Sequence, residues 1–508
     1  MTQETKFAMK PAEGTSKKYH GLGIRHVQMI SMCFCMIALL MARSSLGVAI
    51  LAMTDVSNKN STTVEVYEWD KKTQGLILSS FFWGYITMQI PAGLLAKRFG
   101  GKLILLSALL LNGCLTAVFP TLASLGGWPV ICVVRVAMGL SQACLYPASH
   151  TLLGRWFPTN EVTTYGGIIY SGAQMGTIIA MPLSGYLSET ALGWKMIFYV
   201  ISAIMFLTAG IWYCFSASSP GEHPMMTEEE RNYIEMGLNG IEPGVNQPTP
   251  WLEMLRSRPL WAIVAAHIGG STTFMLFFVD LPTYLERAMQ ISLKNSATLS
   301  ALPYVGMCIG NIGSATLCEW IYNKGLLSKG TSRKVFNSIA MFGAGLGTIV
   351  LAFLGPENKA IAIVMLVIVL TMYGCTSAGY MVNHLDLSPQ FAGVMLSLTN
   401  FAGTVGSICT PVITGFILRN DSSDVSSWRI VFLMAASIAI VSNIIYIVFG
   451  SSNRQPWDNP HYKASRRKTD PEALRAQNVR ELKELELLTS SIESTRYIEC
   501  INKQESND

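Results

Sequence analysis

Apolar residues in this chain are concentrated in long stretches separated by short polar connectors. A helix of about twenty apolar residues crosses the roughly 30 Å hydrocarbon core of a bilayer. The pattern predicts twelve such helices and therefore an all-α membrane protein. The expected spans cover residues 27–54, 73–96, 102–121, 129–153, 164–188, 195–216, 258–285, 295–321, 335–354, 360–383, 391–418 and 428–450.

A charged, proline-containing connector separates the sixth span from the seventh, and polar tails flank the twelve. This division predicts two six-helix bundles, as in transporters whose halves rock about a central site. The expected parts are an N-terminal tail at 1–26, a first bundle at 27–216, a linker at 217–257, a second bundle at 258–451 and a C-terminal tail at 452–508.

Lysine and arginine predict the orientation. They gather in the N-terminal tail and in the connectors after the second and eighth spans, which share one side if the helices alternate. The positive-inside rule makes that side cytoplasmic, with both termini and the linker, in what we expect to be the plasma membrane. The glycosylation sequons at Asn60 and Asn420 then fall outside. The cationic residues are Lys6, Lys10, Lys17, Lys18, Arg25, Lys97, Arg98, Lys102, Lys324, Lys329, Arg333 and Lys334.

The composition agrees with a membrane protein. Half of the residues are hydrophobic and 14% are charged, compared with about 25% charged in soluble domains. Ten of the eleven cysteines lie in apolar spans, where they act as small hydrophobic residues and predict no disulfide framework. The first apolar run follows a lysine-containing polar segment, so no cleavable signal peptide is expected.

Two arginines interrupt the apolar stretches of the first half, which contain no carboxylate. Arg43 lies about eleven residues from the outer end of the first span and Arg135 about six from that of the fourth, which gives similar depths. A guanidinium in the bilayer costs roughly 2.5 kcal/mol or more, and its planar fork suits carboxylate or phosphate. The pair predicts an anion site. The alternative is that each arginine only ties helices together through backbone carbonyls.

Catalytic motifs are missing from the sequence. It contains no H-E-x-x-H metal motif, G-x-S-x-G nucleophile motif or Walker motif, which argues against an enzyme and against an ATP-driven pump. No cofactor, nucleic-acid partner or obligate protein partner is indicated. The expected partners are the lipid bilayer and a small anion.

Several motifs identify the chain as a member of a known family. Residues 74–75, 79–85 and 89–93 resemble the second helix of the anion:cation symporter family of the major facilitator superfamily. That group holds sodium–phosphate cotransporters, sialin and vesicular glutamate transporters, and the match is nearest to insect-type inorganic phosphate cotransporters. The resemblance implies the major facilitator fold. Further matching stretches are 93–102, 135–150, 172–176, 219–224, 281–284, 300–304, 383–386 and 455–457.

The resemblance implies roles for individual residues. The matching arginines of the family, here Arg43 and Arg135, contact the anionic substrate. Gln142 stands where proton-coupled relatives carry glutamate, and because an amide does not titrate, this departure argues against proton symport and favours sodium. The amide oxygen could then be a sodium ligand. The alternative is a glutamine that only packs or forms hydrogen bonds. Leu78 and Gly270 replace a histidine and an arginine of the glutamate transporters, which argues against glutamate as cargo.

Five more residues are candidates, and four of them have an alternative role. Tyr85 is expected to bind substrate or to pack between helices. His150 matches a family histidine and serves conformational coupling or structure. Asp280 pairs with an arginine, assists cation coupling or faces the outer surface. Asp386 near the cytoplasmic boundary is expected to serve in gating or in helix capping. Asn400, in the eleventh span, is a further candidate for coupling or gating.

These observations predict a secondary active transporter that moves inorganic phosphate or a small organic anion by alternating access. A negative cell opposes anion entry by about 2.3 kcal/mol per charge at 100 mV, which a co-transported cation offsets. Sodium is the expected ion. The alternatives are a proton- or potential-driven organic-anion carrier like sialin, and an anion sensor that does not transport.

Overall fold

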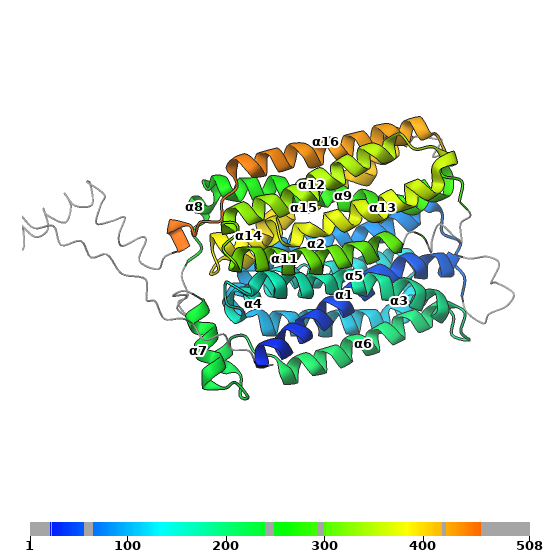
Figure 1. The fold of residues 1–508 in the computed structure, drawn as a ribbon. Coiled ribbons are helices and arrows are strands. Elements are labelled where there is room, and N and C mark those ends of the chain that lie inside the picture. The colour runs from blue at the N-terminus through cyan, green and yellow to red at the C-terminus, as the bar shows by residue number, and fades with distance from the viewer. Residues whose placement is uncertain are drawn as a thin grey trace, which may run out of the picture. The chain divides into compact units, whose positions relative to one another are not determined.

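Long helices follow the apolar stretches of the sequence in the computed structural model (Figure 1). The structure describes residues 21, 23–54, 65–238, 248–291, 299, 301–418 and 423–458, and these contain helices and no strand. They fall into two units. The first, Met1–Asn246 with Leu255–Arg454, holds all the long helices, and the second is Gln247–Met254 with Gln455–Asp508.

The long helices of each half are as follows. In the first half they are α1 (Ile24–Thr54), α2 (Lys71–Phe99), α3 (Gly101–Gln142), α4 (Leu145–Trp156), α5 (Val162–Ser188) and α6 (Trp194–Phe215). In the second they are α9 (Arg258–Thr283), α11 (Leu302–Asn323), α12 (Lys329–Ala352), α13 (Lys359–Gly374), α15 (Ala392–Leu418) and α16 (Val425–Phe449), together with the short α14 (Tyr380–Leu387). The linker between the halves contains two further short helices, α7 (Glu228–Gly237) and α8 (Trp251–Leu255).

The third and fourth crossings form one continuous helical segment that folds back on itself. Gly127 has φ 60° and ψ −156°, a conformation that only glycine adopts readily. Gln142 Nε2 donates to Asn112 Oδ1 at 3.1 Å, and Asn112 also contacts Ser141, so the parts of α3 before and after Gly127 lie side by side. A straight helix would separate these residues by about 45 Å. The chain therefore turns at Gly127, close to the predicted boundary between spans.

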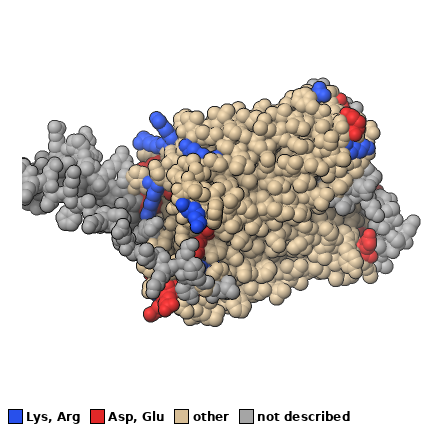
Figure 2. Space-filling model, viewed as in Figure 1, with Lys and Arg blue, Asp and Glu red and all other residues tan. Residues whose placement is uncertain are grey.

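Eight helical segments of the described chain are long and apolar enough to cross a membrane, and one of them, Gly101–Trp156, makes two crossings. The remaining three crossings are made by α2, α5 and α11, which are less apolar than the others. Helices α2 and α5 pack across the interface between the halves, against α15 and α11 respectively. Part of their surface therefore faces protein instead of lipid, which accounts for their lower hydropathy. On the face shown in Figure 2, charged residues lie at the two ends of the helices and the flank between them is uncharged.

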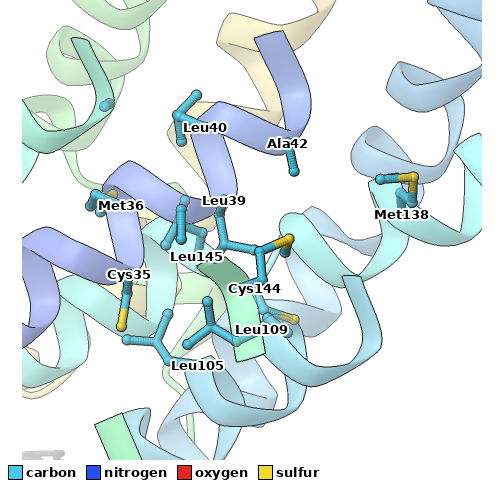
Figure 3. Close-up of a cluster of buried hydrophobic side chains, with 14 of the residues drawn as sticks. Cys35, Met36, Leu39, Leu40, Ala42, Leu105, Leu109, Met138, Cys144 and Leu145 are labelled. Atoms are coloured by element: carbon cyan, nitrogen blue, oxygen red, sulfur yellow. The ribbon is translucent and has the colours of Figure 1, made fainter. Parts of the chain in front are cut away.

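Each half has its own apolar core. The core of the first half packs α1 against α3 and α4 through side chains that include Cys35, Leu39, Leu105 and Leu145 (Figure 3). That of the second half gathers aromatic and aliphatic residues mainly from α9, α13 and α16. Cys35 is free, as expected of a cysteine that packs as a small hydrophobic residue.

A helix in the linker, α7, was not predicted from the sequence. The Thr227 side chain caps it by accepting from the Glu230 backbone N–H at 3.4 Å. The Glu230 carboxylate in turn accepts from the N–H groups of Ile24 and Arg25 at 2.9 and 3.1 Å. A negative charge at the start of a helix stabilises it, so the linker helix caps α1.

The two halves meet in polar contacts at the end of the helices where α1 begins and α2 ends, which we call the basic end. Arg333 of α12 pairs with Asp386 of α14 at 2.8 Å and donates to Thr163 of α5 at 2.9 Å. Lys329 also pairs with Asp386, at 2.7 Å. The sequence placed Arg333 in the loop before the ninth span, and this was wrong. The helix begins at Lys329, and Arg333 is buried within it because Asp386 compensates its charge.

Candidate substrate site

A cavity of about 160 Å³ lies between the two halves. Helices of both halves contribute to its wall, so movement of one half against the other changes its shape. The first half contributes Arg43, Phe82, Tyr85, Tyr146, Tyr170 and Gln174. The second contributes His267, Ser271, Phe274, Met307, Asn311, Tyr373, Thr376, Ser377, Tyr380, Met381, Leu396, Asn400, Thr404 and Ser407.

Among the described residues, Arg43 is the one lysine or arginine that lines this cavity. Its guanidinium carbon lies 5.0 Å from the ring centroids of Phe81 and Phe82 and 5.3 Å from that of Tyr85. Aromatic faces attract a cation without using its N–H donors. Within the described chain no carboxylate pairs with Arg43 and no hydrogen bond to it is found. Its donor fork is therefore free to bind an anion in the cavity.

Arg135 lies behind the cavity wall. It is 3% exposed, its guanidinium carbon is 4.8 Å from the centroid of Phe81, and its Nε has no hydrogen-bond partner among the residues described. Both predicted arginines thus contact Phe81. An uncompensated buried charge is costly, and an anion beside Arg43 would offset part of that cost for both arginines.

Two glycines hold α2 close to α3 beside this ring. A Cβ on Gly139 would lie 2.0 Å from the Phe81 carbonyl oxygen, and one on Gly84 would lie 2.0 Å from the Val136 carbonyl oxygen. We expect Gly139→Ala to push α2 away from α3 and to lower the free energy of unfolding by about 1–3 kcal/mol. The displaced Phe81 should also weaken anion binding.

The measurement is the melting midpoint of the purified protein together with its anion affinity. Gly75→Ala, on α2 with open space around its Cβ position, is the matched control and should keep or slightly raise the midpoint. Equal melting of the two variants would contradict the close packing of α2 on α3.

Tyr85 and Asn400 connect the halves in the cavity wall. Asn400 Nδ2 donates to the Tyr85 hydroxyl at 3.0 Å and to Gln89 Oε1 at 3.1 Å. The contacts join α15 to α2 and hold the phenol of Tyr85 near the Arg43 guanidinium. The structure therefore brings three of the predicted residues, Arg43, Tyr85 and Asn400, to one cavity.

His150 belongs to a buried network that the sequence did not reveal. Its Nε2 lies 2.9 Å from the Met381 carbonyl oxygen in the second half, and its Nδ1 contacts the Tyr170 hydroxyl. His384 contacts the same carbonyl at 2.9 Å and the Thr399 hydroxyl at 2.8 Å. His267, which lines the cavity, reaches that hydroxyl at 3.1 Å. These residues are distant in sequence, so only the fold brings them together.

The other candidates lie away from the cavity. Gln142 donates to Asn112 within the first half, the hydrogen-bonding position that was its alternative to a sodium ligand. Asp280 lies in α9 without an ion pair in the described part of the chain, and Asp386 is in the ion pairs at the basic end. The sequons at Asn60 and Asn420 lie outside the described residues.

Comparison with known proteins decides the family. A family model described as the Major Facilitator Superfamily matches residues 32–411. The chain belongs to the Major Facilitator Superfamily. This major facilitator protein is a membrane transporter and not an enzyme.

Relatives place it in the group that the sequence motifs indicated. A Drosophila ananassae protein named "Putative inorganic phosphate cotransporter" is 36% identical over 397 residues, which cover 78% of this chain and 82% of the relative. Sialin of Homo sapiens is 33% identical over 404 residues, or 79% and 80% of the two chains. Vesicular glutamate transporter 2 of Bos taurus is 33% identical over 428 residues, or 82% and 72%.

Solved structures confirm the fold. The crystal structure of the E. coli fucose:proton symporter matches with a TM-score of 0.60 at 15% identity, covering 83% of this chain and 98% of that one. A bacterial homologue of the iron transporter ferroportin matches with a TM-score of 0.62 at 12% identity, covering 84% and 99%. The predicted major facilitator fold of two six-helix bundles is therefore correct.

Proposed function

We propose that this major facilitator protein moves a small anion, foremost inorganic phosphate, across the membrane by alternating access coupled to sodium. The observation that carries the proposal is Arg43, a permanent cation that lines the cavity between the halves and pairs with no carboxylate of the described residues. Arg135 adds a second positive charge behind Phe81. The relatives named as phosphate cotransporters, sialin and vesicular glutamate transporters support an anionic cargo.

The contacts between the halves support a state closed toward the cytoplasm. The bridge from Arg333 to Thr163 lies at the basic end, and Glu319 accepts from the Thr164 N–H there at 2.7 Å. By the positive-inside rule this end faces the cytoplasm, with both termini on the same side. We assign the protein to the plasma membrane. Opening of these contacts would release the anion inward, and their closure is consistent with loading from outside.

An aromatic wall favours a second candidate cargo. Phe82, Tyr146, Phe274, Tyr373 and Tyr380 line the cavity and offer apolar surface that a bare phosphate would not use. An organic anion would place its charged group at Arg43 and its carbon skeleton against these rings. Proton- or potential-driven transport of such an anion, as in a sialin-like carrier, is the alternative function.

Uptake of radiolabelled phosphate into proteoliposomes tests these functions. Sodium, proton and potential gradients are imposed separately, with sialic acid as the competing organic anion. We expect phosphate uptake that rises with an inward sodium gradient. Uptake that ignores sodium and follows acid pH would overturn sodium coupling, and binding without uptake under any of the three gradients would favour an anion sensor.

A further inference from the structure

A carboxylate in the second half is half-buried and forms no ion pair with the described residues. Asp280 lies in the last turn of α9, near the end opposite the basic end. No ion pair to it is found in the described residues, and its Oδ2 is buried there without a hydrogen-bond partner. Burying a carboxylate oxygen without a partner is costly, so this group calls for a ligand that balances it.

Two further buried oxygens lie on the helices around Asp280. The Thr414 hydroxyl of α15 faces the Asp280 carboxyl. Thr414 is 1% exposed, and its Oγ1 is left without a hydrogen-bond partner in the part of the chain described. Tyr284, one turn beyond Asp280, is also 1% exposed, and its phenol oxygen is equally unsatisfied. Among the described residues, Asp280 Oδ2 and two hydroxyl oxygens thus lack a well-formed hydrogen bond where α15 packs on the end of α9.

The backbone changes its geometry at the same place. Helix α9 is followed by a π-helical turn at Tyr284–Ala288, and the Tyr284 N–H contacts the carbonyl oxygens of both Asp280 and Leu281. Such turns are rare and often occur at functional sites because they redirect side chains and carbonyl groups. The Tyr284 ring packs on Trp428 and Phe432 of α16, with centroids 5.3 and 4.9 Å apart.

The ligand chemistry of this region is that of a hard cation. Carboxylate and hydroxyl oxygens are hard ligands, which suit an alkali or alkaline-earth ion. The hydroxyls of Thr414 and Tyr284 provide oxygen and not the sulfur that softer transition metals prefer. Mg²⁺ keeps most of its water, which a buried region has little room to hold. We propose that Asp280 and Thr414 bind the co-transported sodium ion, with Tyr284 as a further oxygen ligand. This inference rests on the sodium coupling proposed above.

Opposite charges in opposite halves give a physical basis for coupling. Arg43 and Arg135 leave the first half with uncompensated positive charge, and Asp280 leaves the second with uncompensated negative charge. An anion alone neutralises one half, and sodium alone neutralises the other. The carrier loaded with both leaves none of these three charges without a counter-charge, so this state should rearrange most readily.

The test is sodium binding by the full-length purified protein without any anion substrate. The melting midpoint is measured while sodium chloride replaces choline chloride at constant ionic strength. We expect sodium to raise the midpoint of the wild type, and Asp280→Asn to abolish this rise. Thr414→Val should increase the half-saturating sodium concentration roughly tenfold or more, because it removes one oxygen contact to a charged group. Glu286→Gln is the matched control and should respond like the wild type, since that side chain is 32% exposed and pairs with Arg287.

The outcomes separate this site from the transport function. A sodium response that persists in Asp280→Asn would overturn the site, while sodium-dependent uptake by the wild type would still support the proposed function. A wild type that ignores sodium in melting and takes up phosphate with protons would overturn both. If Asp280→Asn does not fold, an unchanged half-saturation in Thr414→Val would overturn the site.

Discussion

Replacing Arg43 with glutamine should weaken anion binding on the order of 100-fold and abolish measurable uptake. In the described part of the chain Arg43 is the only lysine or arginine that lines the cavity, so no second one is found there to supply the lost charge. The empty protein should melt at the same temperature or higher, because the variant removes a cation that has no carboxylate beside it. The measurements are phosphate binding, uptake in proteoliposomes and the melting midpoint with and without phosphate.

Two further variants sharpen this result. Arg43→Lys keeps the charge but loses the planar fork, so it should bind anion with an affinity between those of the wild type and Arg43→Gln. Arg98→Gln removes an exposed arginine at the basic end, and phosphate uptake should be unchanged. Phosphate that still raises the melting midpoint of Arg43→Gln to the wild-type extent would remove Arg43 from the site. Arg135 should then be tested as the principal cation.

The features that the sequence predicted correctly are those with a large local energetic signal. A span of twenty apolar residues is recognisable without any tertiary contact, and nine of the twelve crossings in the described chain meet this criterion. The unusual cost of a guanidinium in an apolar stretch also identified Arg43, which the structure places in the cavity wall. Tyr85 lies in a family motif, Asn400 was singled out by its place in the eleventh span, and the cavity wall contains both.

The features that the sequence missed depend on contacts between distant residues. Arg333 looked like a loop residue because its partner Asp386 is 53 residues away. The histidine network needs helices from both halves, so His267 and His384 gave no signal of their own. Helix α7 is short and polar, and the Thr227–Glu230 capping pattern is the one sequence feature that indicates it.

Replacing Asp386 with asparagine should destabilise the protein by about 3–5 kcal/mol, because it leaves Arg333 buried without its counter-charge. The Arg333 side chain is 3% exposed and that of Asp386 is 1% exposed. The measurement is the melting midpoint in the absence of substrate. Glu235→Gln breaks an exposed ion pair with Arg231 in α7 and is the control, with no measurable change expected. A midpoint for Asp386→Asn equal to that of the control would show that the pair is not needed for the fold.

The contributions of Arg333 to stability and to gating can be tested separately, because it pairs with Asp386 within the second half and donates to Thr163 of the first half. Thr163→Val removes the hydroxyl that accepts from Arg333 at 2.9 Å across the halves and leaves the ion pair with Asp386 in place. Its melting midpoint should fall less than that of Asp386→Asn because the ion pair remains, while the state closed at the basic end loses a charge-assisted hydrogen bond worth about 1.5–3 kcal/mol. The equilibrium then shifts toward the cytoplasm-open state, and phosphate offered from the outside should bind more weakly. Unchanged outside affinity in Thr163→Val, together with a large loss of stability in Asp386→Asn, would make Arg333 a folding residue without a part in gating.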